Sequence, residues 1–531
     1  MSVPIAERLR SRHPGPARDY TVFSMALGRR ALSAAAAALL LAGPIRAKAA
    51  ESSAGDLPRL AVREDGRRLA AENGREFFWL ADTAWSLFTH SSREEREDQP
   101  AVDRYFEIRR RQEFNVVQTH LLTNPVRGPI DGPNVYGHRP FIEGDFTRPL
   151  VRPGPANDYW DYADYLIRRA REHGLYMAIV AVWGNSLGED DSHPLVADPE
   201  TAYAYGWFLG RRYRDEPHIV WLLGGDTFGP RRDRRTLTPA RRRMTRALAE
   251  GIADGIAGVR SFDGQADYSR VLMSYHPPGG GQSSSKYFHA EPWLDFNMIQ
   301  TTTRFRFFNY RQVLADYLKE PPKPVLDGEV AYEHSYPLNR QERERFPGRR
   351  ITAWDVRRGA YWNVFSGGFG HTYGHRSFIG WVRAGEPPLR WGADKPWFEA
   401  LDAEGATQMK WLRRLAESRP MEGREPDQSV ILDEQEDGDD YACALRDREG
   451  RYLMVYVPTG KPLRIRMSAV RGDHAVAWWF SPRTGKARRA GEYPTPDPVT
   501  FRAPSNGPGE DWVLVLDAAS ENYPPPGAAV R

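Results

Sequence analysis

The chain has 531 residues, too many for one ordinary domain, and its single cysteine, Cys443, excludes an intrachain disulfide framework. Residues 1–50 hold 8 of the 74 Lys and Arg and 2 of the 70 Asp and Glu, so the rest of the chain has a formal net charge of −2. This balance gives no support for a nucleic-acid partner, and the arginine-rich runs 231–235 and 241–243 lack interleaved aromatic residues.

Residues 1–50 are predicted to be an export signal. Gly28-Arg29-Arg30 precedes an apolar stretch at 31–43, and Ala47-Lys48-Ala49 resembles a cleavage site. The apolar stretch is too short to span a bilayer, and the paired arginines suggest twin-arginine export. We therefore expect an exported protein, periplasmic or secreted, with no membrane span; the oligomeric state stays open.

Two hairpin signals, Asp65-Gly66 and Asn73-Gly74, predict a small antiparallel sheet at residues 60–77 that closes the floor of the following domain. From residue 77 onward, a short apolar strand followed by an amphipathic helix recurs eight times. The expected strands are Phe77–Trp85, Phe114–Leu122, Leu175–Trp183, His218–Asp226, Val271–His276, Phe296–Thr301, Pro324–Glu333 and Gly368–Tyr373. The expected helices include Arg93–Gln112, Tyr159–His173, Thr201–Tyr213, Pro239–Ile256, Tyr310–Lys319 and Trp354–Phe365.

Strands that alternate with helices predict right-handed β-α-β units on a parallel sheet. Eight units in roughly 300 residues fit a closed (β/α)8 TIM barrel better than an open doubly wound sheet. No G-x-G-x-x-G follows the first strand and no G-x-x-x-x-G-K-[ST] occurs, so nucleotide binding has no support.

The pattern changes after the expected helix Phe398–Ser418 and Pro420. Short alternating segments separated by turn signals predict an all-β sandwich. Its expected strands are Gln428–Leu432, Tyr441–Asp447, Tyr452–Pro458, Pro462–Met467, Ala475–Ser481 and Trp512–Leu516. The predicted domains are a catalytic barrel at 51–422, a β-sandwich at 423–520 and a flexible tail at 521–531.

Two of the predicted barrel strands end in glycine followed by a carboxylate. Asp226 follows Gly224-Gly225, and Glu329 ends Asp327-Gly328-Glu329. Active sites of barrels of this type lie at the carboxyl ends of the strands, and two carboxylates can hydrolyse a glycosidic bond. The alternatives are a capping role for Asp226 and pairing of Glu329 with an arginine; Glu333 competes with Glu329 for the catalytic role.

The other strand ends carry polar or aromatic side chains that can bind a sugar. These substrate-binding candidates are Asp82, Trp85, Gln118, His120, Trp183, Asn185, His276, Gln300, Tyr332, Glu333, His371 and Tyr373. Asp82 is equally suited to a structural role on backbone N–H groups. The histidines lack metal-ligand spacing, so we expect no metal and no cofactor, and the absence of G-x-S-x-G argues against a serine hydrolase.

Several motifs together resemble one family. They are F-W-L-A-D-T-A-W-S-L-F at 78–88, F-N-V-V-Q at 114–118, R-Y-R-D-E-P-H-I-V-W-L-L-G-G-D at 212–226, W-L-D-F-N-M-I-Q at 293–300, K-P-V-L-D-G-E-V-A-Y-E at 323–333 and G-H-T-Y-G at 370–374. Residues 60–411 resemble the apiosidase-like glycoside hydrolases, glycoside hydrolase family 140. The C-terminal module is similar to the collagen-binding-type domain that accompanies this barrel.

The resemblance implies a retaining glycosidase acting on apiose-containing side chains of pectin, with an oligo- or polysaccharide as substrate. It implies that Asp226 is the acid/base and Glu329 the nucleophile; Val330 stands where the family usually has proline. In a retaining enzyme the two carboxyl groups lie about 5–5.5 Å apart, against roughly 6.5–9.5 Å in an inverting one.

Two alternatives stay open at this point. The same residues could hydrolyse another furanoside or pyranoside, such as an arabinoside. The chain could instead be a non-catalytic carbohydrate- or matrix-binding protein in which the C-terminal module makes the contacts, although polar groups at every strand end favour an enzyme.

Overall fold

The computed structural model describes residues 57–124, 127–187, 196, 198–226, 237–301, 303–305 and 307–528. The predicted export signal at 1–50 lies outside these residues. Ser52–Arg531 form one compact unit. Within the described ranges, no helix combines the length and the apolarity that a membrane crossing requires.

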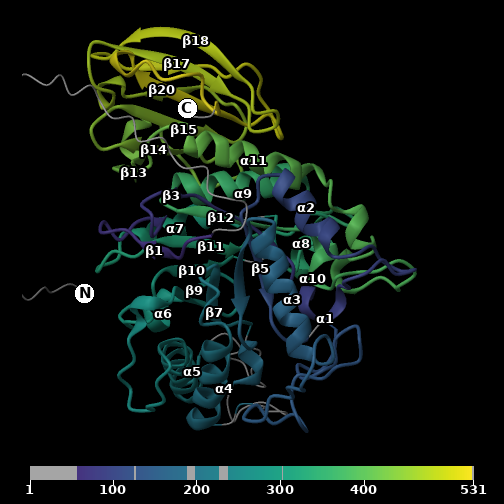
Figure 1. The fold of residues 1–531 in the computed structure, drawn as a ribbon. Helices are drawn as coiled ribbons and strands as arrows, with labels where there is room; N and C mark the ends of the chain where they lie inside the picture. The colour runs from purple at the N-terminus through teal and green to yellow at the C-terminus, as the bar shows by residue number, and fades with distance from the viewer. Residues whose placement is uncertain are drawn as a thin grey trace, which may run out of the picture. The chain divides into compact units, whose positions relative to one another are not determined.

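Eight parallel strands form a closed barrel, which confirms the predicted fold class (Figure 1). They are β4 (Trp79–Thr83), β5 (Val116–His120), β6 (Tyr176–Val180), β7 (Ile219–Gly224), β8 (Met273–His276), β10 (Asn297–Gln300), β11 (Val325–Glu329) and β12 (Gly370–Gly374). One sheet has the order β12-β4-β5-β6-β7-β8, and β10 pairs with β11. Parallel bridges from Ser274 to Phe296 and from Val325 to Gly368 close the ring. The two-residue β9 (Gln282–Ser283) adds to β10 in antiparallel fashion.

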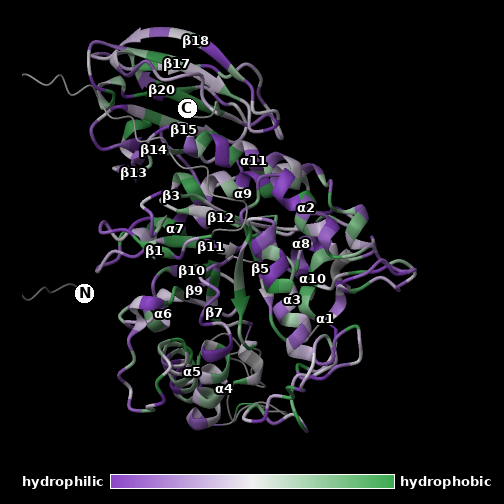
Figure 2. Ribbon diagram, viewed as in Figure 1, coloured by the Kyte–Doolittle hydropathy of each residue, from purple (hydrophilic) through white to green (hydrophobic). Residues whose placement is uncertain are grey.

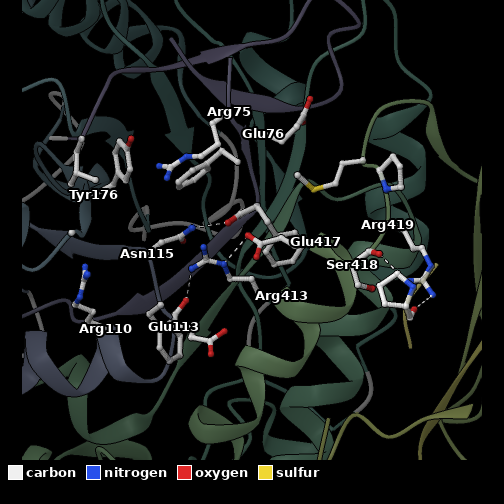
Figure 3. A pocket seen from close by; sticks show the side chains of 18 of the residues that line it. Arg75, Glu76, Arg110, Glu113, Asn115, Tyr176, Arg413, Glu417, Ser418 and Arg419 are labelled. Atoms are coloured by element: carbon white, nitrogen blue, oxygen red, sulfur yellow. Dashed lines mark hydrogen bonds and ion pairs between the residues drawn. The ribbon is translucent and has the colours of Figure 1, made fainter. Parts of the chain in front are cut away.

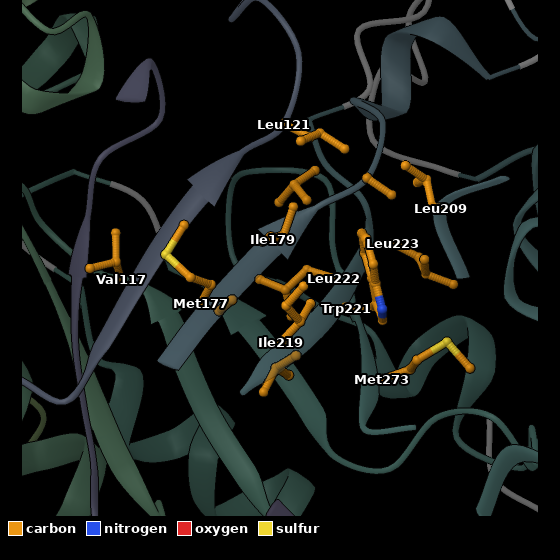
Figure 4. Packing of buried hydrophobic residues seen from close by; sticks show 14 of the residues in the cluster. Val117, Leu121, Met177, Ile179, Leu209, Ile219, Trp221, Leu222, Leu223 and Met273 are labelled. Carbon is orange, nitrogen blue, oxygen red and sulfur yellow. The ribbon is translucent and has the colours of Figure 1, made fainter. Parts of the chain in front are cut away.

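The barrel strands are apolar along their whole length because both of their faces are covered. Every residue of β4, β5, β6 and β7 is buried, one face against the barrel interior and the other against helices. Figure 4 shows part of this core, with side chains from β5, β6 and β7 beside Leu209 of the helix layer. Figure 2 shows the hydrophobic residues concentrated on strands such as β5.

Helices fill the connections between the strands. They are α1 (Leu87–His90), α2 (Asp103–Arg111), α3 (Tyr159–Glu172), α4 (Pro199–Arg212), α5 (Pro239–Ala257), α6 (Ser285–Phe288), α7 (Asn309–Tyr317), α8 (Arg340–Arg345), α9 (Ala353–Phe365), α10 (Arg376–Ile379) and α11 (Glu404–Glu417). Side-chain caps mark three starts: Asp158, Asp198 and Thr238 accept backbone N–H groups of the first turns of α3, α4 and α5.

The helix expected at Arg93–Gln112 is shorter than predicted. It begins at Asp103, and an antiparallel bridge between Arg96 and Gln99 makes a turn in the preceding segment. Pro100 explains the difference, because proline inside a helix loses a hydrogen bond and clashes with the carbonyl four residues earlier. The long apolar-periodic segment therefore contributes only its second half to the helix.

Helices α4 and α5 pack backbone to backbone. Each has two glycines four residues apart on the contact face: Gly206 and Gly210 on α4, Gly251 and Gly255 on α5. A β-carbon at any of these positions would overlap backbone atoms of the facing helix. The close contact brings together the helices that precede and follow β7, the strand that leads to Asp226.

The predicted hairpins at the start of the described chain are present. β1 (Leu60–Val62), β2 (Leu69–Ala71) and β3 (Glu76–Phe77) form an antiparallel sheet. Gly66 and Gly74 have φ of 64° and 83°, the left-handed conformation that these turns require. The sheet contacts the amino end of β6, where Tyr176 packs edge-on against Phe77.

The C-terminal module has two antiparallel sheets. The strands are β13 (Arg424–Pro426), β14 (Cys443–Asp447), β15 (Tyr452–Val457), β16 (Leu463–Ile465), β17 (His474–Phe480), β18 (Ala487–Pro494), β19 (Val499–Phe501) and β20 (Trp512–Ala518). One sheet has the order β13-β14-β15-β20-β17-β18, and β16 pairs with β19. The strand expected at Gln428–Leu432 is wrong: Gln428–Val430 form a 3-10 turn, capped by the side chain of Asp427.

The central strands of the large sheet of the module, such as β15 and β20, are buried on both faces. One face packs on β16 and β19, through residues such as Leu453 and Leu463. The other face packs on α9 and α11, where Tyr456 stacks on Tyr361 with ring centroids 4.8 Å apart. The module and the outer helices of the barrel thus share one hydrophobic core.

Candidate active site

A β-bulge in β11 directs Glu329 toward the barrel mouth. In a regular strand, residues two apart share a face, so Asp327 and Glu329 would point the same way. The register between β10 and β11 shifts by one residue at Gly328. Asp327 accepts hydrogen bonds from Thr301 Oγ1 (2.6 Å) and from Asn309 in the helix layer (3.2 Å). Glu329, in contrast, faces the last residue of β8.

That residue is His276, and its Nε2 lies 3.2 Å from Glu329 Oε2. His276 Nδ1 lies 3.2 Å from the carbonyl oxygen of Pro277. The histidine ring is fully buried, so its contact with Glu329 is shielded from water. The arrangement places an imidazole nitrogen against one oxygen of Glu329.

Asp226 reaches the mouth through two glycines with positive φ. Gly224 and Gly225 have φ of 76° and 147°. A β-carbon at Gly224 would overlap the ring of Tyr275, and one at Gly225 would lie 2.7 Å from the ring of Trp183. Only glycine fits both the backbone conformation and the space, so these residues let the chain turn out of β7 and present the next side chain.

The protonated form of Asp226 is favoured by its surroundings. Burial of the carboxyl group and the negative charge of Glu329 raise the pKa of Asp226 to about 6, while His276, Gln300 and the N–H of Gly279 oppose the shift. The Gly279 N–H donates to Asp226 Oδ1 at 3.0 Å. Part of the Asp226 residue is exposed although its carboxyl group is enclosed, and Glu329 is buried. The two carboxyl groups therefore interact electrostatically and lie in different environments.

Aromatic side chains line the space around this pair. Trp85 and Trp183 pack edge to face at 5.3 Å and flank the ring of His276. Tyr332 accepts a hydrogen bond from Trp85 Nε1 at 3.0 Å, and its hydroxyl donates to Glu329. The predicted residues Trp85, Trp183, His276 and Tyr332 thus lie together with the two carboxylates.

His120 also lies in this group, with its ring 5.4 Å from that of Trp183. Burial lowers the pKa of His120 to about 3, so the ring is neutral. Gln300 makes a side-chain hydrogen bond to Asp226, which places it beside the carboxyl group and not at the outer rim. Asn185 lies in the 3-10 turn Gly184–Ser186 that follows β6.

Four predicted substrate-binding residues, Asp82, Glu333, His371 and Tyr373, point away from the mouth of the barrel. Their predicted contacts with substrate are therefore wrong. Asp82 accepts hydrogen bonds from Tyr105 and Arg109 of α2, both at 2.7 Å, and is fully buried. Glu333 accepts from Tyr373 at 2.5 Å and from the N–H of Gly405 at 3.0 Å. These contacts attach the strands to the outer helices.

The alternation of side chains along the strands explains this placement. Thr372 of β12 accepts a hydrogen bond from Trp79 inside the barrel, so its neighbours His371 and Tyr373 face the helices. Burial lowers the pKa of His371 to about 3. Asp82 likewise follows the inward-facing Ala81. The sequence showed that polar residues end these strands, but not on which face.

Gln118 is fully buried below the carboxylates. Its Nε2 donates to the carbonyl oxygen of Gly328 at 2.8 Å, so the amide nitrogen is bound to protein backbone. This contact favours a structural role for Gln118 over the predicted sugar contact.

Three residues of the site were not predicted from the sequence. They are Asp327, Gly279 and Arg376. Arg376 is buried at the start of α10; burial lowers its pKa to about 10, and the negative charge of Glu329 opposes that shift. The sequence did contain a signal for Arg376, since it lies two residues after the polar strand end G-H-T-Y-G at 370–374. Among the described residues, no group of three or more His, Cys, Asp or Glu side chains is arranged to hold a metal ion.

A cavity of about 910 Å³ lies at the opposite, amino end of the strands (Figure 3). Its wall includes Arg75, Asn115 and Tyr176 from the barrel floor and Arg413 and Glu417 from α11. Arg413 pairs with Glu417 at 2.9 Å. The cavity contains none of the residues around Asp226 and Glu329, so its size alone does not make it the active site.

Comparisons with known proteins agree with this fold. Residues 63–422 match the family described as "Apiosidase-like, catalytic domain", and residues 426–517 match a collagen-binding-like domain of a collagenase. A solved structure of a glycoside hydrolase is 34% identical, with a TM-score of 0.75, over 88% of this chain and 98% of that chain. A glycoside hydrolase family 5 structure from Bacteroides vulgatus ATCC 8482 is 33% identical, with a TM-score of 0.74, over 89% and 96%.

No curated protein matches the chain in sequence. The family match extends over more than half of the chain, and both similar structures are covered almost completely. The chain therefore belongs to the apiosidase-like family of glycoside hydrolases, with a collagen-binding-like domain after its catalytic barrel.

Proposed function

We propose that this protein is a retaining glycoside hydrolase of family 140 in which Glu329 is the nucleophile and Asp226 the acid/base. The observation that carries the proposal is the position of two carboxyl groups at the ends of β7 and β11, where Asp226 accepts from the N–H of Gly279 at 3.0 Å and Glu329 lies 3.2 Å from His276. Burial and the charge of Glu329 raise the pKa of Asp226 to about 6. An acid that stays protonated beside an ionised nucleophile is what double displacement requires.

In the first step, a carboxylate oxygen of Glu329 bonds to the anomeric carbon while the bond from that carbon to the leaving oxygen breaks. The proton of Asp226 passes to the leaving oxygen. In the second step, Asp226 takes a proton from water, the water oxygen bonds to the anomeric carbon, and Glu329 is released.

The charge of Glu329 connects the two roles of Asp226. While Glu329 is ionised, its charge raises the pKa of Asp226 and keeps the acid protonated. The ester to the sugar removes that charge, so the pKa of Asp226 falls and the group becomes a base. Tyr332 donates to Glu329 and would stabilise it again as the leaving carboxylate, with His276 Nε2 3.2 Å from the same group.

We further propose pectic glycans as the substrate class and apiose-containing side chains as the specific target, on the strength of the family. Another furanoside, such as an arabinoside, uses the same two carboxylates and differs only in how its hydroxyls fit among Trp85, His120 and Trp183. Export to the periplasm or medium, as the first 50 residues suggest, would bring the enzyme to such polymers.

The test is hydrolysis by the full chain of aryl apiosides, arabinosides and related glycosides, together with pectic oligosaccharides. NMR of the first-formed sugar reports the anomeric configuration. We expect retention, and loss of turnover by at least 100-fold in Asp226→Asn and Glu329→Gln. Glu333→Gln is the matched control and should keep its activity, because this buried carboxylate faces the helices. Full activity in either active-site variant would remove that residue from its role.

A further inference from the structure

The peptide bond between Gly328 and Glu329, here the bulge peptide, is held from two sides. From inside the barrel, Gln118 Nε2 donates to its carbonyl oxygen at 2.8 Å. Gln118 belongs to β5, which is separated from β11 by β4 and β12, so its side chain crosses the barrel interior. This bond is therefore not part of the ladder between neighbouring strands.

From the helix side, the side chain of Asp327 accepts a hydrogen bond from the N–H of Glu329, the other end of the same peptide. Asp327 is itself fixed by Thr301 Oγ1 at 2.6 Å and by Asn309 Nδ2 at 3.2 Å. Asn309 Nδ2 also donates to the carbonyl of Gly359 at 2.9 Å, which connects the group to α9. Each polar end of the bulge peptide thus has a buried side-chain partner.

The bulge needs such partners more than a regular strand does. A bulge leaves one residue out of the ladder, and here that residue is glycine, which has the least restricted backbone. A side chain cannot supply the restriction, because a β-carbon at Gly328 would lie 2.8 Å from the sulfur of Met298. Rotation of the bulge peptide would change the direction in which Glu329 leaves the strand.

We propose that Gln118 and Asp327 are positioning residues that fix the bulge peptide and so aim Glu329 at the anomeric carbon. The inference rests on the proposed role of Glu329 as nucleophile. Both residues are fully buried, and both bond to the bulge peptide through their side chains. Their effect is on the chemical step, because a misdirected nucleophile binds substrate normally but attacks slowly.

The main variant is Gln118→Met, which keeps the length of the side chain and removes the donor. We expect kcat to fall about 10- to 100-fold with KM changed less than about twofold. Ser274→Ala is the matched control: Ser274 is also buried inside the barrel and donates to a strand carbonyl, that of Phe296, at 2.6 Å. It should lower stability without lowering kcat.

Asp327 is tested by a conservative pair. Asp327→Asn keeps an oxygen that can accept from the Glu329 N–H and should retain most of kcat, whereas Asp327→Ala should lose it. Hydrogen exchange at the Glu329 amide is measured in parallel, and we expect faster exchange in Gln118→Met and Asp327→Ala than in wild type or Ser274→Ala.

A wild-type kcat in Gln118→Met would overturn the proposal, and so would a rise in KM alone, which would return Gln118 to substrate contact. If the wild-type chain hydrolyses no glycoside, the proposed function fails while the exchange measurement still decides the inference. Unchanged exchange at Glu329 in both variants would then reject it.

Discussion

Asp226 and Glu329 lie near each other but have different partners. Glu329 faces His276 Nε2 at 3.2 Å and accepts a hydrogen bond from the hydroxyl of Tyr332. Asp226 accepts hydrogen bonds from Gln300 and from the N–H of Gly279. These bonds lower the pKa of Asp226 less than burial and the charge of Glu329 raise it. The difference divides the two chemical roles between otherwise similar side chains.

One prediction concerns the pH dependence of the rate. Asp226 must be protonated to donate in the first step, and its pKa is raised to about 6. We therefore expect kcat/KM to fall as pH rises through about 6. The measurement is a pH–rate profile between pH 4 and 9; a rate that stays constant up to pH 8 would contradict Asp226 as the acid.

A second prediction concerns stability. The folded-state pKa of Asp226 is raised, so ionisation costs stability: the cost is absent below the unfolded pKa near 4 and complete above about 6. Asp226→Asn removes this cost, and we expect it to stabilise the fold at pH 8 by on the order of 2 kcal/mol relative to its effect at pH 4. Thermal unfolding of both proteins at the two pH values checks the sign, and an equal difference at both would refute it.

At the scale of elements, β7 depends on the backbone contact between α4 and α5. The glycines on both helices let the axes approach more closely than any side chain permits. Glycine inside a helix costs about 1 kcal/mol relative to alanine, so four such residues are unfavourable for the isolated helices. The packing that they allow must outweigh that cost.

Gly251→Ala separates these two effects. Propensity alone predicts a gain of about 1 kcal/mol, whereas the new β-carbon would overlap the carbonyl of Tyr203 and force the helices apart, at about 1–3 kcal/mol or more. We expect net destabilisation, measured by chemical denaturation. Arg243→Ala on the exposed side of α5 is the control and should be nearly neutral; a stabilised Gly251→Ala would show that the helices can separate freely.

The elements could be predicted to different degrees. Apolar runs such as 219–224 indicated strands of the barrel, because parallel strands covered on both faces need no alternation. Less apolar strands such as β12 followed from the regular succession of strand and helix. The edge strand β18, rich in arginine, was missed because its residues are largely exposed. The bulge at Gly328 could not be predicted from the sequence pattern. The sequence therefore could not show that Glu329 faces the barrel interior while Asp327 faces the helices.

At the scale of the whole molecule, the barrel and the C-terminal module are joined by buried charges as well as by apolar contacts. Arg357 of α9 makes two hydrogen bonds to Asp511, at 2.8 and 3.1 Å, and both side chains are almost completely buried. Arg419 bonds Asp517 in the same two-pronged way. The contact resembles a domain interior, so we expect the module and the barrel to fold and unfold together.

This contact gives a further prediction. Arg357→Met leaves the buried charge of Asp511 without its ion-pair partner, and Asp511→Asn does the same to Arg357. Each single variant should lower the free energy of unfolding by about 3–5 kcal/mol. The double variant removes both charges, so we expect it to be clearly more stable than the sum of the single effects. A double-mutant cycle by denaturation measures the coupling; the exposed pair Arg340 and Glu344 should give about 0.3–0.5 kcal/mol.

The shared core also limits how such a gene can change by recombination. Recombination between residues 422 and 426 would pack α9 and α11 against the sheet of another protein. That sheet would lack the carboxylate that pairs with Arg357 and the aromatic ring that stacks on Tyr361. Donor modules would be accepted only with matching helices, and the two parts are expected to be inherited as one piece.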